Sequence, residues 1–196
     1  MLDQELVLQM KEYAEDENVP IMNDDGIMYL VDFIGRFNVK KILEIGTAIG
    51  YSAIMMASCS PDIIVTTIER DEKRYLEAIK NIKKAKLEDR IHLIYSDAFD
   101  VKLDDKFDLI FIDAAKAQSI NFFEMFEKNL TEKGAIITDN MNFHGLVNED
   151  PENIKSRNLR QLVRKIKKYR DFLENNNDYD TEIIDIGDGL AVSMKK

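Results

Sequence analysis

Residues 40–52, which read KKILEIGTAIGYS, constrain the fold more than any other stretch of the chain. The apolar run at 40–45 predicts a strand, Gly46 and Gly50 mark a turn, and residues 51–60 have a helical pattern. A strand, a glycine-bearing turn and a helix in this order let backbone N–H groups approach a ligand closely. We therefore expect an α/β protein with a ligand site at this turn.

Strands and helices alternate along the rest of the chain. Apolar, β-branched runs predict strands, and apolar residues at helical spacing predict helices. The remaining predicted strands cover 63–68, 91–95, 107–112, 135–138, 181–186 and 190–194. The other predicted helices cover 2–17, 27–34, 71–86, 118–130 and 152–174, and a turn is predicted at Lys133–Gly134.

This order predicts a doubly wound, mostly parallel, seven-stranded Rossmann-like sheet. Gly187, Asp188 and Gly189 lie between the last two strands and predict an antiparallel hairpin. We expect a single domain over 1–196, with N-terminal helices in 1–37 and the core in 38–196.

Most of the predicted parallel strands stop at a residue that can bind a ligand. These residues are Gly46, Glu69, Asp97, Asp113 and the pair Asp139–Asn140. Ligands on doubly wound sheets bind outside the carboxyl ends of the strands. The recurrence of these residues is the main functional signal in the sequence.

The glycine spacing indicates which nucleotide-like ligand is excluded. The dinucleotide fingerprint is G-x-G-x-x-G, whereas this chain has E-x-G-x-x-x-G from Glu44 to Gly50. A nicotinamide oxidoreductase is therefore disfavoured. Glu69, about twenty residues after the turn, can accept hydrogen bonds from a ribose diol. Asp97 and Ala98 are placed to read an adenine edge.

Asp113, Asp139 and Asn140 form a set of hard oxygen donors at neighbouring strand ends. Two carboxylates and one amide oxygen suit Mg²⁺ or Mn²⁺ and leave positions for a substrate. Lys116 follows Asp113 by three residues. A lysine beside a divalent cation has a lowered pKa and can act as a general base.

The motifs LEIGTAIGYS, TIERD, SDA, FIDAAK and ITDN occur in this order. With them the chain resembles the class I S-adenosylmethionine (SAM)-dependent methyltransferases, and among these the metal-dependent O-methyltransferases of the catechol and caffeoyl-CoA type. The resemblance implies SAM as cofactor, a metal at Asp113, Asp139 and Asn140, catalysis by Lys116 with Asp113, and a homodimer. It implies cofactor contacts from Met22, Glu44, Gly46, Ser52, Glu69, Asp97, Ala98 and Asp113.

Residues 155–170 hold eight basic residues and no acidic one. This strip suits a polyanion, and we expect RNA contacts from Arg157, Arg160, Arg164, Lys165, Lys167 and Lys168. Together with VPIM and GDGLA, the segment is similar to the bacterial methyltransferases that convert 5-hydroxyuridine to 5-methoxyuridine at the tRNA wobble position. His144, just after the metal pair, is a weaker candidate for a phosphate contact.

Two alternatives to the tRNA hypothesis remain open. The same catalytic residues suit small catechol-like or phenolic acceptors, and a binding protein with a vestigial site would keep the fold. A net charge of −10 argues against a DNA-binding protein. Cys59 is the only cysteine, which suits the reducing cytoplasm, and no apolar run is long enough to span a membrane.

Overall fold

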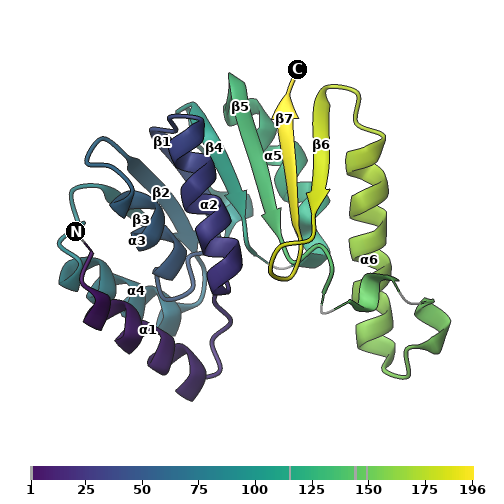
Figure 1. Ribbon diagram of the computed structural model, residues 1–196, viewed down its shortest axis with the longest axis horizontal. Coiled ribbons are helices and arrows are strands. Elements are labelled where there is room, and N and C mark those ends of the chain that lie inside the picture. Colours follow the sequence, from purple (N-terminus) through teal and green to yellow (C-terminus); the bar gives the residue numbers. More distant parts are fainter. Residues whose placement is uncertain (1, 115, 144, 149) are drawn as a thin grey trace.

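The computed structural model describes residues 2–114, 116–143, 145–148 and 150–196. Its seven-stranded sheet has the order β3-β2-β1-β4-β5-β7-β6, in which β7 runs antiparallel to both of its neighbours (Figure 1). The predicted doubly wound sheet with a C-terminal antiparallel hairpin is thus confirmed. The strands are β1 Lys41–Ile45, β2 Ile64–Glu69, β3 Ile91–Tyr95, β4 Phe107–Ile112, β5 Leu130–Asp139, β6 Tyr179–Ile184 and β7 Leu190–Lys195.

Helices cover both faces of this sheet (Figure 1). The α-helices are α1 Gln4–Asp16, α2 Asp24–Arg36, α3 Tyr51–Ser58, α4 Glu72–Lys84, α5 Ser119–Phe126 and α6 Arg157–Glu174. Short 3-10 helices lie at η1 Ala98–Asp100, η2 Lys116–Gln118, η3 Glu127–Asn129, η4 Leu146–Asn148 and η5 Pro151–Asn153. None of the helices within the described residues is long and apolar enough to cross a membrane.

Alternate residues of the central strands supply two hydrophobic cores, one on each face. In β4, Phe111 packs with residues of α1, α2 and α3, whereas Ile110 and Ile112 pack with α5 and α6. Such continuous apolar strands are expected where a parallel sheet is covered on both faces. The two cores fix the strand ends rigidly, and the candidate site lies at those ends.

The predicted turn at Lys133–Gly134 is wrong, because both residues lie inside β5. The pairing of β4 with β5 shifts between Phe107↔Leu130 and Leu109↔Ala135, so β5 carries an irregularity there. A Cβ atom on Gly134 would lie 2.6 Å from the Leu130 side chain. The glycine is therefore needed for close packing within a bulged strand rather than for a reversal of the chain.

The last helix also begins later than the predicted residue 152. Pro151 opens the short η5, and α6 starts only at Arg157. The Ser156 side chain accepts a hydrogen bond from Leu159 N at 3.4 Å and so caps α6. Amphipathic spacing extends past this cap into η5, which explains the early predicted start.

Candidate active site

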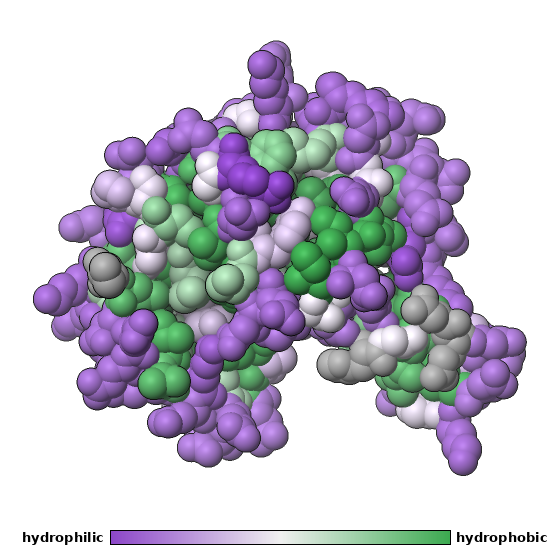
Figure 2. Space-filling model, viewed as in Figure 1, coloured by the Kyte–Doolittle hydropathy of each residue, from purple (hydrophilic) through white to green (hydrophobic). Residues whose placement is uncertain are grey.

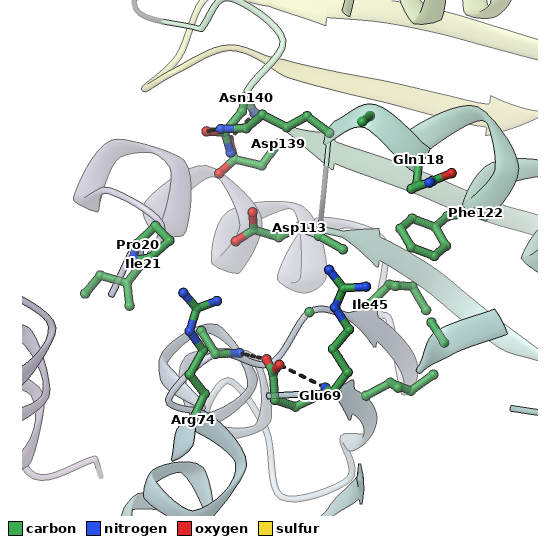
Figure 3. Close-up of a pocket in the computed structure, with 18 of the residues that line it drawn as sticks. Pro20, Ile21, Ile45, Glu69, Arg74, Asp113, Gln118, Phe122, Asp139 and Asn140 are labelled. Atoms are coloured by element: carbon green, nitrogen blue, oxygen red, sulfur yellow. Dashed lines mark hydrogen bonds between the residues drawn. The ribbon is translucent and has the colours of Figure 1, made fainter. Parts of the chain in front are cut away.

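A cavity of about 790 Å³ opens at the carboxyl ends of the parallel strands. Its walls come from the β1–α3 turn, the ends of β2 to β5, the loop before α2 and the β6–β7 turn (Figure 3). Figure 2 shows a hollow between the body of the molecule and a lobe at lower right, where Figure 1 places η5 and the start of α6. The volume falls within the range of small-molecule and cofactor sites.

Gly46 and Glu69 build the wall at the β1–α3 turn. Gly46 has φ +100°, and a Cβ atom there would lie 2.3 Å from Asp113 O, so only glycine fits. Glu69 Oε2 accepts a hydrogen bond from Ala48 N at 2.8 Å, which fixes the turn to the end of β2. Glu69 Oε1 accepts from Arg70 N and Asp71 N at 2.9 and 2.8 Å. A carboxylate has about four acceptor positions, so Glu69 can still bind a hydroxyl of a ligand.

Three of the predicted cofactor residues do not line this cavity. Glu44 is fully buried, and its carboxylate accepts hydrogen bonds from the Ser52 hydroxyl and, at 2.5 Å, from the Thr67 hydroxyl. Burial raises the pKa of Glu44 to about 7, although these two hydrogen bonds oppose the shift. Met22 is also buried, at 4% exposure. Glu44 and Ser52 therefore bind each other, and direct contact with a cofactor stays a prediction for all three residues.

The β3 end of the cavity is aromatic. Phe99 stacks on Phe122 with ring centroids 4.8 Å apart, and Ala98 lies beside them in the cavity wall. Asp97 Oδ1 accepts from Phe99 N at 3.1 Å, and its Oδ2 accepts from Arg70 Nη1 at 3.3 Å. This end suits the face of a nucleobase. The Asp97 carboxylate that we expected to read an adenine edge already has two partners.

The predicted metal ligands lie together at the ends of β4 and β5, where they form a second wall that begins beside the Gly46 turn (Figure 3). Burial, followed by repulsion from Glu44, raises the pKa of Asp113 to about 6. Burial, followed by repulsion from Asp113, raises the pKa of Asp139 to about 7. The charge of Lys116 only partly offsets the repulsion between these two carboxyl groups, so their chemistry fits a divalent cation. Among the described residues no group of three or more His, Cys, Asp or Glu side chains has a metal-binding arrangement; the predicted set is two carboxylates and the Asn140 amide.

Lys116 lies beside these ligands. Its Nζ donates a hydrogen bond to Asn140 Oδ1 at 2.5 Å and lies 4.7 Å from the centroid of the Phe143 ring. Burial lowers the pKa of Lys116, and the charges of Asp113, Asp188 and Asp139 partly oppose this. The lowered pKa that we expected from a neighbouring cation thus already has a cause in the protein itself.

Sequence reasoning missed several residues that line the cavity, among them Asn23, Arg70, Arg74 and Asp188. Asp188 is placed by backbone hydrogen bonds of the β6–β7 turn to the segment after Asn140: Met141 N donates to Gly189 O and Asn142 N to Asp188 O. The motif GDG predicted only a hairpin, so nothing local marked Asp188. His144 lies outside the described residues.

The basic strip on α6 is partly engaged within the protein. Arg160 Nη2 donates to Ile154 O at 2.9 Å, and Arg164 pairs with Glu152. Arg157, Lys165 and Lys168 are exposed, and Lys167 is partly buried. The apolar face of α6 packs inward, and its Leu162 reaches the cavity. No described contact assigns a partner to the exposed side chains, so RNA binding stays a prediction.

Comparison with known proteins places the chain among methyl-transferring enzymes. A model of the O-methyltransferase family matches residues 2–196. Caffeoyl-CoA O-methyltransferase of Populus kitakamiensis is 30% identical over 193 residues, which cover 94% of this chain and 82% of that protein. A crystal structure from Staphylococcus aureus, described as a candidate caffeoyl-CoA O-methyltransferase, superposes with a TM-score of 0.92 at 42% identity and covers 97% of this chain and 92% of that one. A Bacillus cereus O-methyltransferase solved with S-adenosylhomocysteine (SAH) shares the fold, with a TM-score of 0.85 at 24% identity and coverage of 99% and 92%.

Proposed function

Because the chain belongs to the O-methyltransferase family, we propose that it transfers a methyl group from SAM to a hydroxyl of a catechol-like acceptor. One observation carries the proposal. The Gly46–Glu69 wall, suited to a nucleoside, and the group of Asp113, Asp139, Asn140 and Lys116 line the same cavity. A methyl donor bound at the first wall therefore faces an acceptor bound at the second.

The cofactor proposal is supported by the shape and chemistry of the first wall. Glu69 suits the ribose, and the Phe99–Phe122 pair suits the adenine. Gly46 lets the turn pack directly against the Asp113 backbone, and Gly46 itself lines the cavity. The SAH bound by the Bacillus cereus relative is the product of the same cofactor.

The second wall supplies the acceptor side of the reaction. Asp113, Asp139 and Asn140 would hold Mg²⁺ or Mn²⁺. When bound, this ion supplies positive charge that favours ionisation of the acceptor hydroxyl. An acceptor with two adjacent oxygens suits this wall best, because both oxygens could bind the metal ion at coordination positions that the protein does not fill.

Lys116 is the proposed general base. Its lowered pKa favours the neutral amine, which takes the proton of the acceptor hydroxyl. The acceptor oxygen then forms a bond to the methyl carbon while the carbon–sulfur bond of SAM breaks. The electron pair of that bond stays on sulfur and leaves SAH, and Lys116 returns its proton to solvent. Orientation in the cavity supplies much of the rate.

A small phenolic acceptor is the form of this proposal that the relatives favour, since the poplar protein is named for caffeoyl-CoA. The tRNA hypothesis, methylation of 5-hydroxyuridine, rests on the basic strip of α6. It is the second candidate, because Arg157, Lys165 and Lys168 are exposed on the helix whose Leu162 reaches the cavity.

The test is a methyl-transfer assay with SAM labelled in its methyl group. The purified protein is incubated with Mg²⁺ and either caffeic acid, caffeoyl-CoA or tRNA that carries 5-hydroxyuridine. We expect label in the phenolic acceptors and formation of SAH. Label in the tRNA alone would establish the second candidate, and no SAH with any acceptor that has adjacent oxygens would overturn the proposal.

A further inference from the structure

Two neighbouring basic residues in the first turn of α4 have different surroundings. Lys73 extends outward, and its Nζ pairs with Glu17 Oε2 at 2.5 Å at the end of α1. Arg74 is partly buried and lines the cavity. Figure 3 shows its side chain extending from α4 into the space between Pro20–Ile21 and Asp113. The Asp71 side chain caps α4 by accepting from Arg74 N at 2.9 Å, so the backbone position of Arg74 is fixed.

The other cations of the cavity already have partners. Lys116 donates to Asn140, and Arg70 pairs with Asp97 at 3.3 Å. Within the part of the chain that the structure describes, Arg74 forms no ion pair with a carboxylate. The remaining charged lining residues, which include Glu69, Asp113, Asp139 and Asp188, are acidic. An anionic group of a ligand would therefore be attracted to Arg74 and repelled by most of the other walls.

The position of Arg74 indicates which ligand group it meets. It lies on the Pro20–Ile21 side of Glu69, away from the Phe99–Phe122 end (Figure 3). A nucleoside with its ribose at Glu69 and its base at the aromatic end would extend its other substituent toward Arg74. In SAM that substituent is the methionine part, which carries a carboxylate.

We propose that Arg74 binds the carboxylate of the methionine part of SAM. This inference rests on the proposed function for the identity of the cofactor. A guanidinium can bind a carboxylate through two parallel hydrogen bonds, which a lysine cannot reproduce. The hydroxyl of Ser52, another residue expected to contact the cofactor, donates to Glu44 instead of pointing into the cavity.

Calorimetric binding of two ligands tests the inference. SAH has the methionine-derived part, whereas 5′-methylthioadenosine has the same adenosine and sulfur without an amino acid group. We expect Arg74→Ala to lower the affinity for SAH about tenfold or more, the usual effect of losing a hydrogen bond to a charged group. The affinity for 5′-methylthioadenosine should not change. Arg74→Lys should recover only part of the SAH affinity. Lys73→Ala, which removes the same charge from the same helical turn, should change neither affinity.

Three outcomes would overturn the inference. An equal loss for both ligands in Arg74→Ala would place Arg74 at the adenosine, and unchanged binding of both would remove it from the site. If the unaltered protein bound neither ligand, the proposed cofactor would be wrong and the inference would fail with it. Circular dichroism melting of each variant checks that a loss of affinity does not come from unfolding.

Discussion

Lys116 Nζ donates a hydrogen bond to Asn140 Oδ1 at 2.5 Å, which joins the segment after β4 to the end of β5 across the candidate site. One partner is the proposed general base and the other is a proposed metal ligand. Because the two proposed roles differ, substitutions at the carboxyl ends of β4 and β5 should separate proton transfer from metal binding, although this contact helps to position both residues.

Lys116→Met should lower kcat by roughly 10²–10⁴-fold, the usual contribution of a general base. SAH affinity should stay near that of the unaltered protein, because Lys116 lies on the acceptor wall. In the unaltered enzyme, activity should rise with pH as the amine loses its proton, with a midpoint below the ordinary lysine pKa of 10.5. A pH–rate profile checks this, and a variant with an unchanged profile would exclude Lys116 as the base.

Asp139→Ala or a chelator should abolish methyl transfer while SAH still binds. Asp139 is a predicted metal ligand, whereas the cofactor wall is built from the ends of β1, β2 and β3. Mg²⁺ or Mn²⁺ added after chelation should restore the unaltered enzyme but not the variant. Full activity in the presence of chelator would contradict the metal proposal. Loss of SAH binding in Asp139→Ala would show that the cofactor wall and the acceptor wall are not independent.

Gly46→Ala and Gly50→Ala form a matched pair. Both glycines have positive φ, which costs alanine about 1–2 kcal/mol. A Cβ atom at Gly50 would lie 3.5 Å from Ala78 Cβ, an ordinary contact, whereas at Gly46 it would lie 2.3 Å from Asp113 O. We expect Gly46→Ala to lose about 1–3 kcal/mol more in the free energy of unfolding, through overpacking. Denaturant titration measures the unfolding free energy of both variants. Equal losses would contradict the close approach of Gly46 to Asp113 O.

Glu44→Gln should remove a pH dependence of stability. The pKa of Glu44 is about 7 in the folded protein against an ordinary 4.5, so the folded state holds the proton more tightly. Stability is therefore lost as pH rises from 4.5 to about 7, by about 3 kcal/mol for such a shift. The difference in unfolding free energy between Glu44→Gln and the unaltered protein should change in favour of the variant by that amount between pH 4 and pH 8. Asp139 titrates in both proteins, whereas Asp113 loses the repulsion from Glu44 in the variant, which lowers its pKa and shifts the difference in the same direction. A difference independent of pH would therefore contradict the shift.

Charge reversal on α6 separates the two acceptor classes. Arg157, Lys165 and Lys168 are exposed, and reversing all three should leave methylation of a small phenol within about twofold, as for most surface substitutions. If tRNA is methylated, its methylation should fall steeply and depend on salt. Lys83→Glu with Lys84→Glu, on the last turn of α4, is the control for charge alone. A steep loss with the phenol in the α6 variant would show that α6 acts on the site directly.

The sheet could be predicted because its strands are buried on both faces and read as short apolar runs. The predicted ends of β4 and β5 bring Asp113, Asp139 and Asn140 into the lining of one cavity, as expected. Gly134 could not be interpreted from the sequence, since a glycine in a bulge and a glycine in a turn look the same. The orientations of the Ser52 and Arg74 side chains could not be predicted from the sequence, for another reason. Whether a side chain on a helix faces a cavity or a neighbouring residue depends on packing between elements distant in sequence.

The β6–β7 turn has a consequence for synthesis of the protein. Asn23 lies against Gly187 and Asn142 against Gly189, where a Cβ atom would come within 2.5 and 2.7 Å of the asparagine side chains. This turn is translated after Gly46, Glu69, Asp113 and Asp139, and β7 is translated after β5, with which it pairs. A nascent chain on the ribosome thus contains the residues of both walls before it contains the segment that braces them. The protein should become active only after this hairpin has left the exit tunnel, long after the β1–α3 turn has emerged.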